Sequence, residues 1–127
     1  MSGTGWYGRM VQGLDAARAA QLDAGLARIR ARFVESLSDR IDALYEHLDA
    51  LQDIEGWTAA TAALRAQAHK LHGICGSVGF PRIGERAAQL EHRIDSLTDL
   101  SGPQVRDELR ELVNRLLDEM ERSLDAK

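Results

Sequence analysis

Residues 57–80 read WTAATAALRAQAHKLHGICGSVGF and carry the clearest structural signal in the chain. Their apolar residues recur at steps of three and four, which is the spacing of one face of an α-helix. At about 100° per residue, the repeated positions fall within about 40° of a common direction, so they predict a face buried in a core. These positions are Leu64, Ala68, Leu71, Cys75 and Val78. Because Gly79 and Pro81 follow, we expect the helix to run from about Trp57 to Val78.

Three further segments show the same periodicity. Residues 14–51 form the longest, which predicts one long helix or two helices end to end. Residues 83–97 follow Pro81, a residue suited to the first turn of a helix, and residues 105–124 follow Pro103. Four amphipathic helices joined by short links predict an all-α fold, an antiparallel up-down four-helix bundle. Residues 1–14 contain four glycines, and we expect them to form an additional short N-terminal helix or arm across one end of the bundle.

The bulk composition fits a single soluble domain. The 127 residues suffice for one hydrophobic core, with residues 15–127 in the bundle. The net charge is only −4, and Lys and Arg are interleaved with Asp and Glu, so no basic block favours a nucleic acid or a membrane surface. No apolar stretch reaches the roughly 20 residues of a membrane helix. Because Cys75 is the single cysteine and the N-terminus lacks a signal-peptide pattern, we expect a cytoplasmic protein.

His69 lies on a different side of the predicted helix from the buried face. It projects about 140° from the buried direction, so we expect an exposed imidazole. Gly73 and Gly76 lie on the same side, and each glycine costs about 1 kcal/mol relative to alanine inside a helix. A bare surface beside the imidazole would let another molecule come close. Two other interpretations stay open: a solvated surface histidine, and glycines that let neighbouring helices pack over the His69 face.

Other chemistries find little support in the sequence. His69, His72 and Cys75 have a spacing that suggests a metal site, but Cys75 points about 100° or more away from His69 and no second cysteine occurs. Gly73 and Gly76 lie inside a helix, whose backbone amides are already bonded, rather than in a phosphate-binding loop. No nucleophile motif of a hydrolase occurs. We therefore expect no metal and no cofactor of the protein's own.

The run from Ala68 to Phe80, AHKLHGICGSVGF, resembles the signature of histidine-phosphotransfer (HPt) domains, in which A-H-x-L-K-G precedes small residues and an apolar-Gly pair. Ala87, Leu90 and Glu91 resemble the A-x-x-L-E of the family's next helix. The resemblance implies a single HPt domain over residues 1–127, a phosphocarrier and not an enzyme. It implies that His69 accepts a phosphoryl group from a receiver-domain aspartate and passes it to another, with Mg²⁺ supplied by the receiver.

The resemblance also assigns roles near His69. Glu91 matches an acidic or amide residue that bonds the histidine's Nδ1, which would leave the Nε2 lone pair available; an ordinary solvated glutamate is the alternative. The family usually places Lys or Arg three residues after the histidine, where this chain has His72. Arg65, one turn earlier on the same face, and Lys70, about 100° around the helix, are candidates to replace that charge. A partly protonated His72 would make transfer depend on pH.

The expected partners follow from the same resemblance. A response-regulator receiver domain, a hybrid histidine kinase or both would dock on the face around His69, and we expect the carrier to be a monomer. N-terminal apolar residues would contribute to the docking surface. The other docking residues that we expect are Gly73, Gly76, Ile74 and Phe80.

Two other functions are alternatives for a helical protein with a histidine at this position. A helical adaptor that binds a receiver or a partner helix without being phosphorylated is conceivable, because His72 stands where the family usually has Lys. A sensor-kinase dimerisation hairpin is disfavoured, because such kinases need an attached ATP-binding domain and usually have an acidic residue directly after the histidine. Lys70 occupies that position here.

Overall fold

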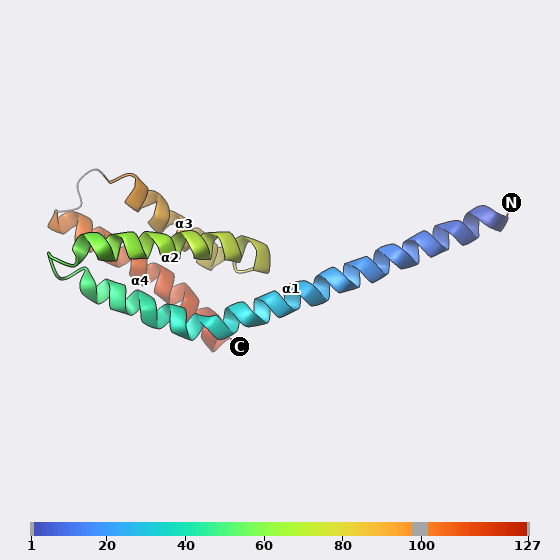
Figure 1. The fold of residues 1–127 in the computed structure, drawn as a ribbon, viewed down its shortest axis with the longest axis horizontal. Helices are drawn as coiled ribbons and strands as arrows, with labels where there is room; N and C mark the ends of the chain where they lie inside the picture. Colours follow the sequence, from blue (N-terminus) through green and yellow to red (C-terminus); the bar gives the residue numbers. More distant parts are fainter. Residues whose placement is uncertain (1, 98–101, 127) are drawn as a thin grey trace.

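The computed structural model describes residues 2–97 and 102–126, with side chains from residue 13 onward. These residues form α1 (Ser2–Ala50), α2 (Trp57–Val78), α3 (Pro81–Asp95) and α4 (Pro103–Asp125). The C-terminal half of α1 and the other three helices pack side by side, each against its two neighbours in the order α1, α2, α3, α4 and back to α1 (Figure 1). The described residues therefore confirm the all-α four-helix bundle.

The core of the bundle is built from one apolar stripe of each helix. In α2 it contains the five positions picked out by periodicity, none of which is more than 5% exposed. Leu71 and Leu90 are fully buried, as is Leu116 on α4. At the start of α2, the indole of Trp57 donates a hydrogen bond of 2.6 Å to the hydroxyl of Thr61, which satisfies the one buried polar side chain of the described core. Burial of these stripes fixes how each helix is rotated about its axis.

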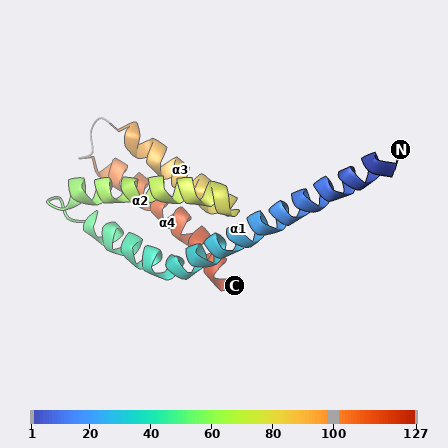
Figure 2. The ribbon, with the colours of Figure 1, turned by 45° about the vertical axis from the view of Figure 1, so that its right-hand side comes forward.

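The N-terminal segment differs from the prediction. Residues 2–14 are the first part of α1 instead of a separate helix or arm, and this part of α1 leads away from the bundle (Figures 1 and 2). No proline interrupts the helix, and residues 16–24 are rich in alanine, which favours its continuation. Burial of apolar side chains against the bundle begins at Phe33, whereas Leu22 and Ile29 before it are 68% and 51% exposed.

A tight turn joins α2 to α3 and brings the two helices together. Gly79 ends α2 with φ +84°, a left-handed conformation that glycine adopts without strain, and its N–H donates to the carbonyl of Cys75. Pro81 then begins α3, as expected for a proline at the first helical position. A Cβ atom added at Gly84 would lie only 3.2 Å from the Cβ of Cys75. Gly84 therefore permits the close approach of α3 to α2.

Among the described helices, none has the length and apolar character needed to cross a membrane.

Candidate functional site

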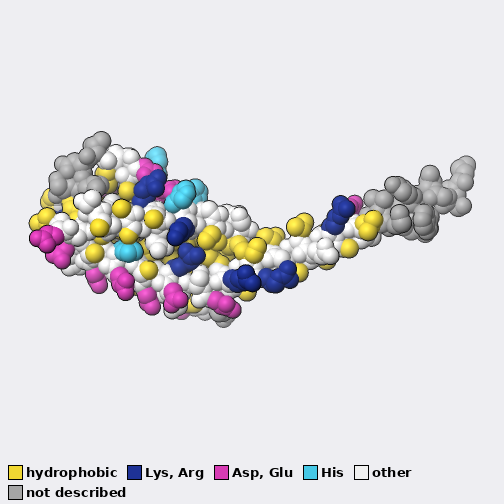
Figure 3. Space-filling model, viewed as in Figure 1, with side chains coloured by type: hydrophobic (Ala, Val, Ile, Leu, Met, Phe, Trp, Pro, Cys, Tyr) yellow, Lys and Arg dark blue, Asp and Glu magenta, His cyan; other side chains and the backbone are white. Residues whose placement is uncertain are grey.

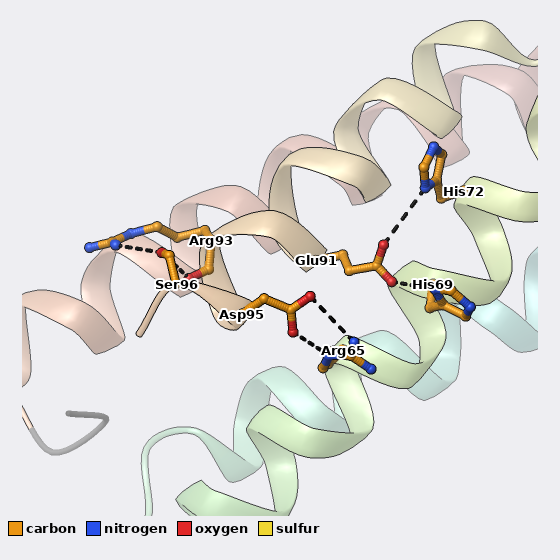
Figure 4. Close-up of polar contacts among 7 residues, drawn as sticks. All are labelled: Arg65, His69, His72, Glu91, Arg93, Asp95 and Ser96. Carbon is orange, nitrogen blue, oxygen red and sulfur yellow. Dashed lines mark hydrogen bonds and ion pairs between the residues drawn. The ribbon is translucent and has the colours of Figure 1, made fainter. Parts of the chain in front are cut away.

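His69 lies on the edge of α2 that borders α3. Its side chain is 69% exposed, as the helical geometry predicts. Its Nδ1 is hydrogen-bonded to Oε2 of Glu91, which comes from the facing edge of α3 (Figure 4). Glu91 is only 15% exposed and follows the fully buried Leu90, whose burial fixes how this part of α3 is turned toward α2. The structure therefore brings together the two residues that the resemblance pairs.

The contact with Glu91 sets the chemistry of the imidazole. A carboxylate can only accept a hydrogen bond, so Nδ1 carries the proton in this pair. In a neutral imidazole the other nitrogen, Nε2, then holds the lone pair. An exposed nitrogen with a free lone pair is a nucleophile that a partner protein can reach.

His72 shares the carboxylate of Glu91. Its Nδ1 lies 3.7 Å from Oε1, which is too long for a hydrogen bond. The side chain is 55% exposed. Glu91 thus lies between two imidazoles, with His72 on the side away from Nε2 of His69 (Figure 4).

Arg65 does not stand alone beside His69, because Asp95 of α3 binds it through both carboxylate oxygens. Arg65 Nε donates to Oδ1, and Nη2 donates to Oδ2 at 3.3 Å. The hydrogen bonds from Arg65 lower the pKa of Asp95 below its ordinary value. The same contact raises the pKa of Arg65. Sequence reasoning missed Asp95, although one signal was available: it follows Glu91 by four residues, as His69 follows Arg65.

The glycines beside His69 are open to solvent. A Cβ atom added at Gly73 or Gly76 would meet nothing within 4 Å. Both residues are exposed, so the interpretation in which they let neighbouring helices pack closely is wrong. That role belongs to Gly84. At Gly73 and Gly76 the surface of α2 is free of side-chain bulk, as expected if another molecule comes close to His69 there.

The remaining predicted site residues differ in their surroundings. Lys70 is exposed and enters none of the ion pairs formed by the described side chains. Ile74 is half-buried and packs against the core on the side of α2 that borders α1. Phe80 is also half-buried: its ring lies 5.1 Å from that of Phe33, and the guanidinium of Arg30 lies 4.9 Å above it. Part of the Phe80 ring is therefore in contact with α1 and is not available to a partner.

Cys75 does not belong to the site. Its side chain is buried in the core, and burial raises the pKa of the thiol to about 11. A thiol in that state is neither a ready nucleophile nor a ready metal ligand. Across the described ranges, no group of three or more His, Cys, Asp or Glu side chains is arranged to hold a metal ion.

The charges around the site are unevenly distributed. On the face shown in Figure 3, His, Lys and Arg side chains lie beside Asp and Glu side chains near the upper edge of the bundle, and further Asp and Glu side chains follow its lower edge. At the site itself, the carboxylates of Asp95 and Glu91 accompany Arg65 and His69.

Comparison with known protein families identifies a match for most of the chain. The model of the Hpt domain family matches residues 28–126, which include the whole bundle and every candidate site residue. No curated protein and no solved structure matches the chain.

Proposed function

Since this chain belongs to the Hpt domain family, whose members are phosphocarriers of two-component signalling, we propose that its carrier residue is His69. In this proposal His69 accepts a phosphoryl group from the aspartate of one receiver domain and passes it to the aspartate of another. The supporting observation is the exposed imidazole with Nδ1 hydrogen-bonded to Glu91.

That geometry supports the following transfer step. The Nε2 lone pair of His69 attacks the phosphorus of the receiver's acyl phosphate. A P–N bond forms, the P–O bond to the receiver breaks, and its electron pair stays on the aspartate carboxylate. The proton remains on Nδ1, where Glu91 stabilises the positive charge that the phosphorylated ring acquires. The reverse step returns the phosphoryl group to a receiver.

The partner is proposed to supply what this chain does not. A receiver domain, free or within a hybrid histidine kinase, would bring the aspartate and Mg²⁺. The bare surface at Gly73 and Gly76 would admit its loops, with Ile74 and Phe80 at the margin of the contact. His72 stands where the family usually has Lys or Arg. We therefore propose that the rate of phosphoryl transfer depends on pH, because an imidazole gains or loses its charge near neutral pH.

The test is phosphotransfer from labelled receiver domains. The purified protein is incubated, with Mg²⁺, with each phosphorylated receiver domain of the source organism. We expect at least one receiver to transfer acid-labile phosphate to the wild type. His92→Gln is the matched control, because His92 is also an exposed helical histidine. It should be labelled normally, whereas His69→Gln should not be labelled.

The same experiment decides against the proposal in two ways. Label that persists in His69→Gln would show that another residue is the acceptor. A wild type that binds a receiver but takes no label from any of them would favour the non-phosphorylated adaptor, the alternative that His72 raises.

A further inference from the structure

Two polar side-chain contacts, one helical turn apart, join the facing edges of α2 and α3. His69 contacts Glu91, and one turn away Arg65 contacts Asp95 (Figure 4). The two residues of each helix are four positions apart, so they lie one above the other on the same edge. The guanidinium of Arg65 is thus held one helical turn from the proposed phospho-acceptor.

The Arg65–Asp95 pair is suited to exchange. Both side chains are 46% exposed, and an ion pair between side chains this exposed contributes little to stability. The pair can therefore open at small cost. Arg65 is also a long side chain, with reach along the helix edge toward His69.

We propose that Arg65 is the phosphoryl-binding cation of this carrier, and that phosphorylation of His69 moves its guanidinium from Asp95 to the phosphoryl oxygens. The inference rests on the proposed function of His69. Asp95 is then a positioning residue: it keeps Arg65 beside His69 while the imidazole is unmodified, and it competes with the phosphoryl group afterwards.

The charges favour the exchange. A phosphoryl group carries roughly −1.5 to −2 at neutral pH, whereas Asp95 carries a single negative charge. A guanidinium binds phosphate oxygens through two parallel hydrogen bonds, as it binds a carboxylate. Arg65 can therefore exchange its bidentate contact with Asp95 for a bidentate contact with the phosphoryl group, which carries the greater negative charge.

The neighbouring cations are less well placed. His72 contacts Glu91 on the Nδ1 side of the ring, away from the nitrogen that would be phosphorylated. Lys70 directly follows His69, so it projects about 100° around the helix. Arg65 shares the His69 edge of α2 with His72, and of the two only Arg65 carries a permanent positive charge.

The test uses a small phosphodonor, so that no partner is needed. Phosphoramidate transfers its phosphoryl group to imidazole Nε2, with cleavage of its P–N bond and release of ammonia. The full chain is phosphorylated in this way, and the Nε–Hε signal of Arg65 is followed by ¹H–¹⁵N NMR. We expect this signal to shift on phosphorylation, because the acceptor of the hydrogen bond changes.

The second readout is the ³¹P signal as a function of pH. A guanidinium about 4 Å from the phosphoryl group favours its dianion, so Arg65→Gln should raise the pKa of the phosphoryl group by about 0.7 of a unit. Asp95→Asn removes the competing carboxylate, so that pKa should equal or fall below the wild-type value. Glu91 and His72 also face the site and are unchanged in both variants.

The matched control is the Arg93–Glu108 pair between α3 and α4. It is also bidentate, at 2.7 and 3.0 Å, with side chains 37% and 45% exposed. Arg93→Gln should leave the ³¹P titration unchanged. A wild type phosphorylated on His69, with an unmoved Arg65 signal and an Arg65→Gln titration identical to its own, would overturn the assignment of Arg65 alone. A wild type that takes no phosphoryl group on His69 from phosphoramidate or from any receiver would overturn the proposed function as well.

Discussion

Replacing Gly73 and Gly76 with alanine should stabilise the bundle and hinder its partner at the same time. A methyl group at either position meets nothing within 4 Å, so the substitutions create no clash. Alanine is favoured over glycine inside a helix by about 1 kcal/mol. The double variant should therefore gain about 2 kcal/mol in free energy of unfolding, provided that the two sites act independently.

The assay compares stability with transfer. Urea unfolding followed by circular dichroism gives the free energy of unfolding, and the rate of phosphotransfer from a receiver gives function. Gly73→Leu, which adds more bulk on the same open face, should slow transfer more than Gly73→Ala while the bundle stays folded. Gly84→Ala is the contrasting variant: its Cβ would lie 3.2 Å from the Cβ of Cys75, so we expect it to gain less stability than the same substitution at Gly73 or Gly76.

Two results would refute this reasoning. A Gly73, Gly76 double variant that is no more stable than the wild type would show that these positions are not open. Unchanged transfer by Gly73→Leu would show that the bare face does not serve docking.

Three further predictions concern the site and α1. Glu91→Ala should slow transfer to His69 by about tenfold or more, since it removes a hydrogen bond to a charged group that contributes about 1.5–3 kcal/mol; receiver-to-carrier transfer rates check this, and an unchanged rate would contradict it. Because Arg65 lowers the pKa of Asp95, their pair stabilises the fold at neutral pH and is lost as pH falls through that lowered value, below 3.8. Melting temperatures of wild type and Asp95→Asn should therefore differ slightly at pH 7 and converge well below pH 3.8; a difference that persists there would argue against the pair. Deleting residues 2–27 should change the melting temperature of the bundle by only about 2 °C, because none of the described side chains of residues 13–27 is buried; a large loss of stability would show that this part of α1 packs against something.

The helices of the bundle were predictable because burial is one-sided. The apolar stripe of α2 repeats without interruption, and Gly79 and Pro81 mark its end, so the predicted bounds of Trp57 and Val78 match the structure. The exposure of His69 follows from the same stripe, because a rigid helix fixes the direction of every other side chain.

Contacts between helices were harder to predict. The pairing of Arg65 with Asp95 depends on how α2 and α3 are aligned along their axes, and on the close approach that Gly84 permits. Periodicity within one helix carries no information about that alignment. The N-terminal segment was mispredicted for another reason: its glycines suggested a break, but a glycine inside a helix costs only about 1 kcal/mol and need not end it.

The position of the phosphoryl group tests the role of His69 most directly. After transfer from a phosphorylated receiver, ¹H–¹⁵N NMR of the imidazole nitrogens identifies the phosphorylated atom. We predict a single phosphoryl group on Nε2 of His69, with Nδ1 still protonated and bonded to Glu91. A phosphoryl group on Nδ1, or on any residue other than His69, would contradict that role.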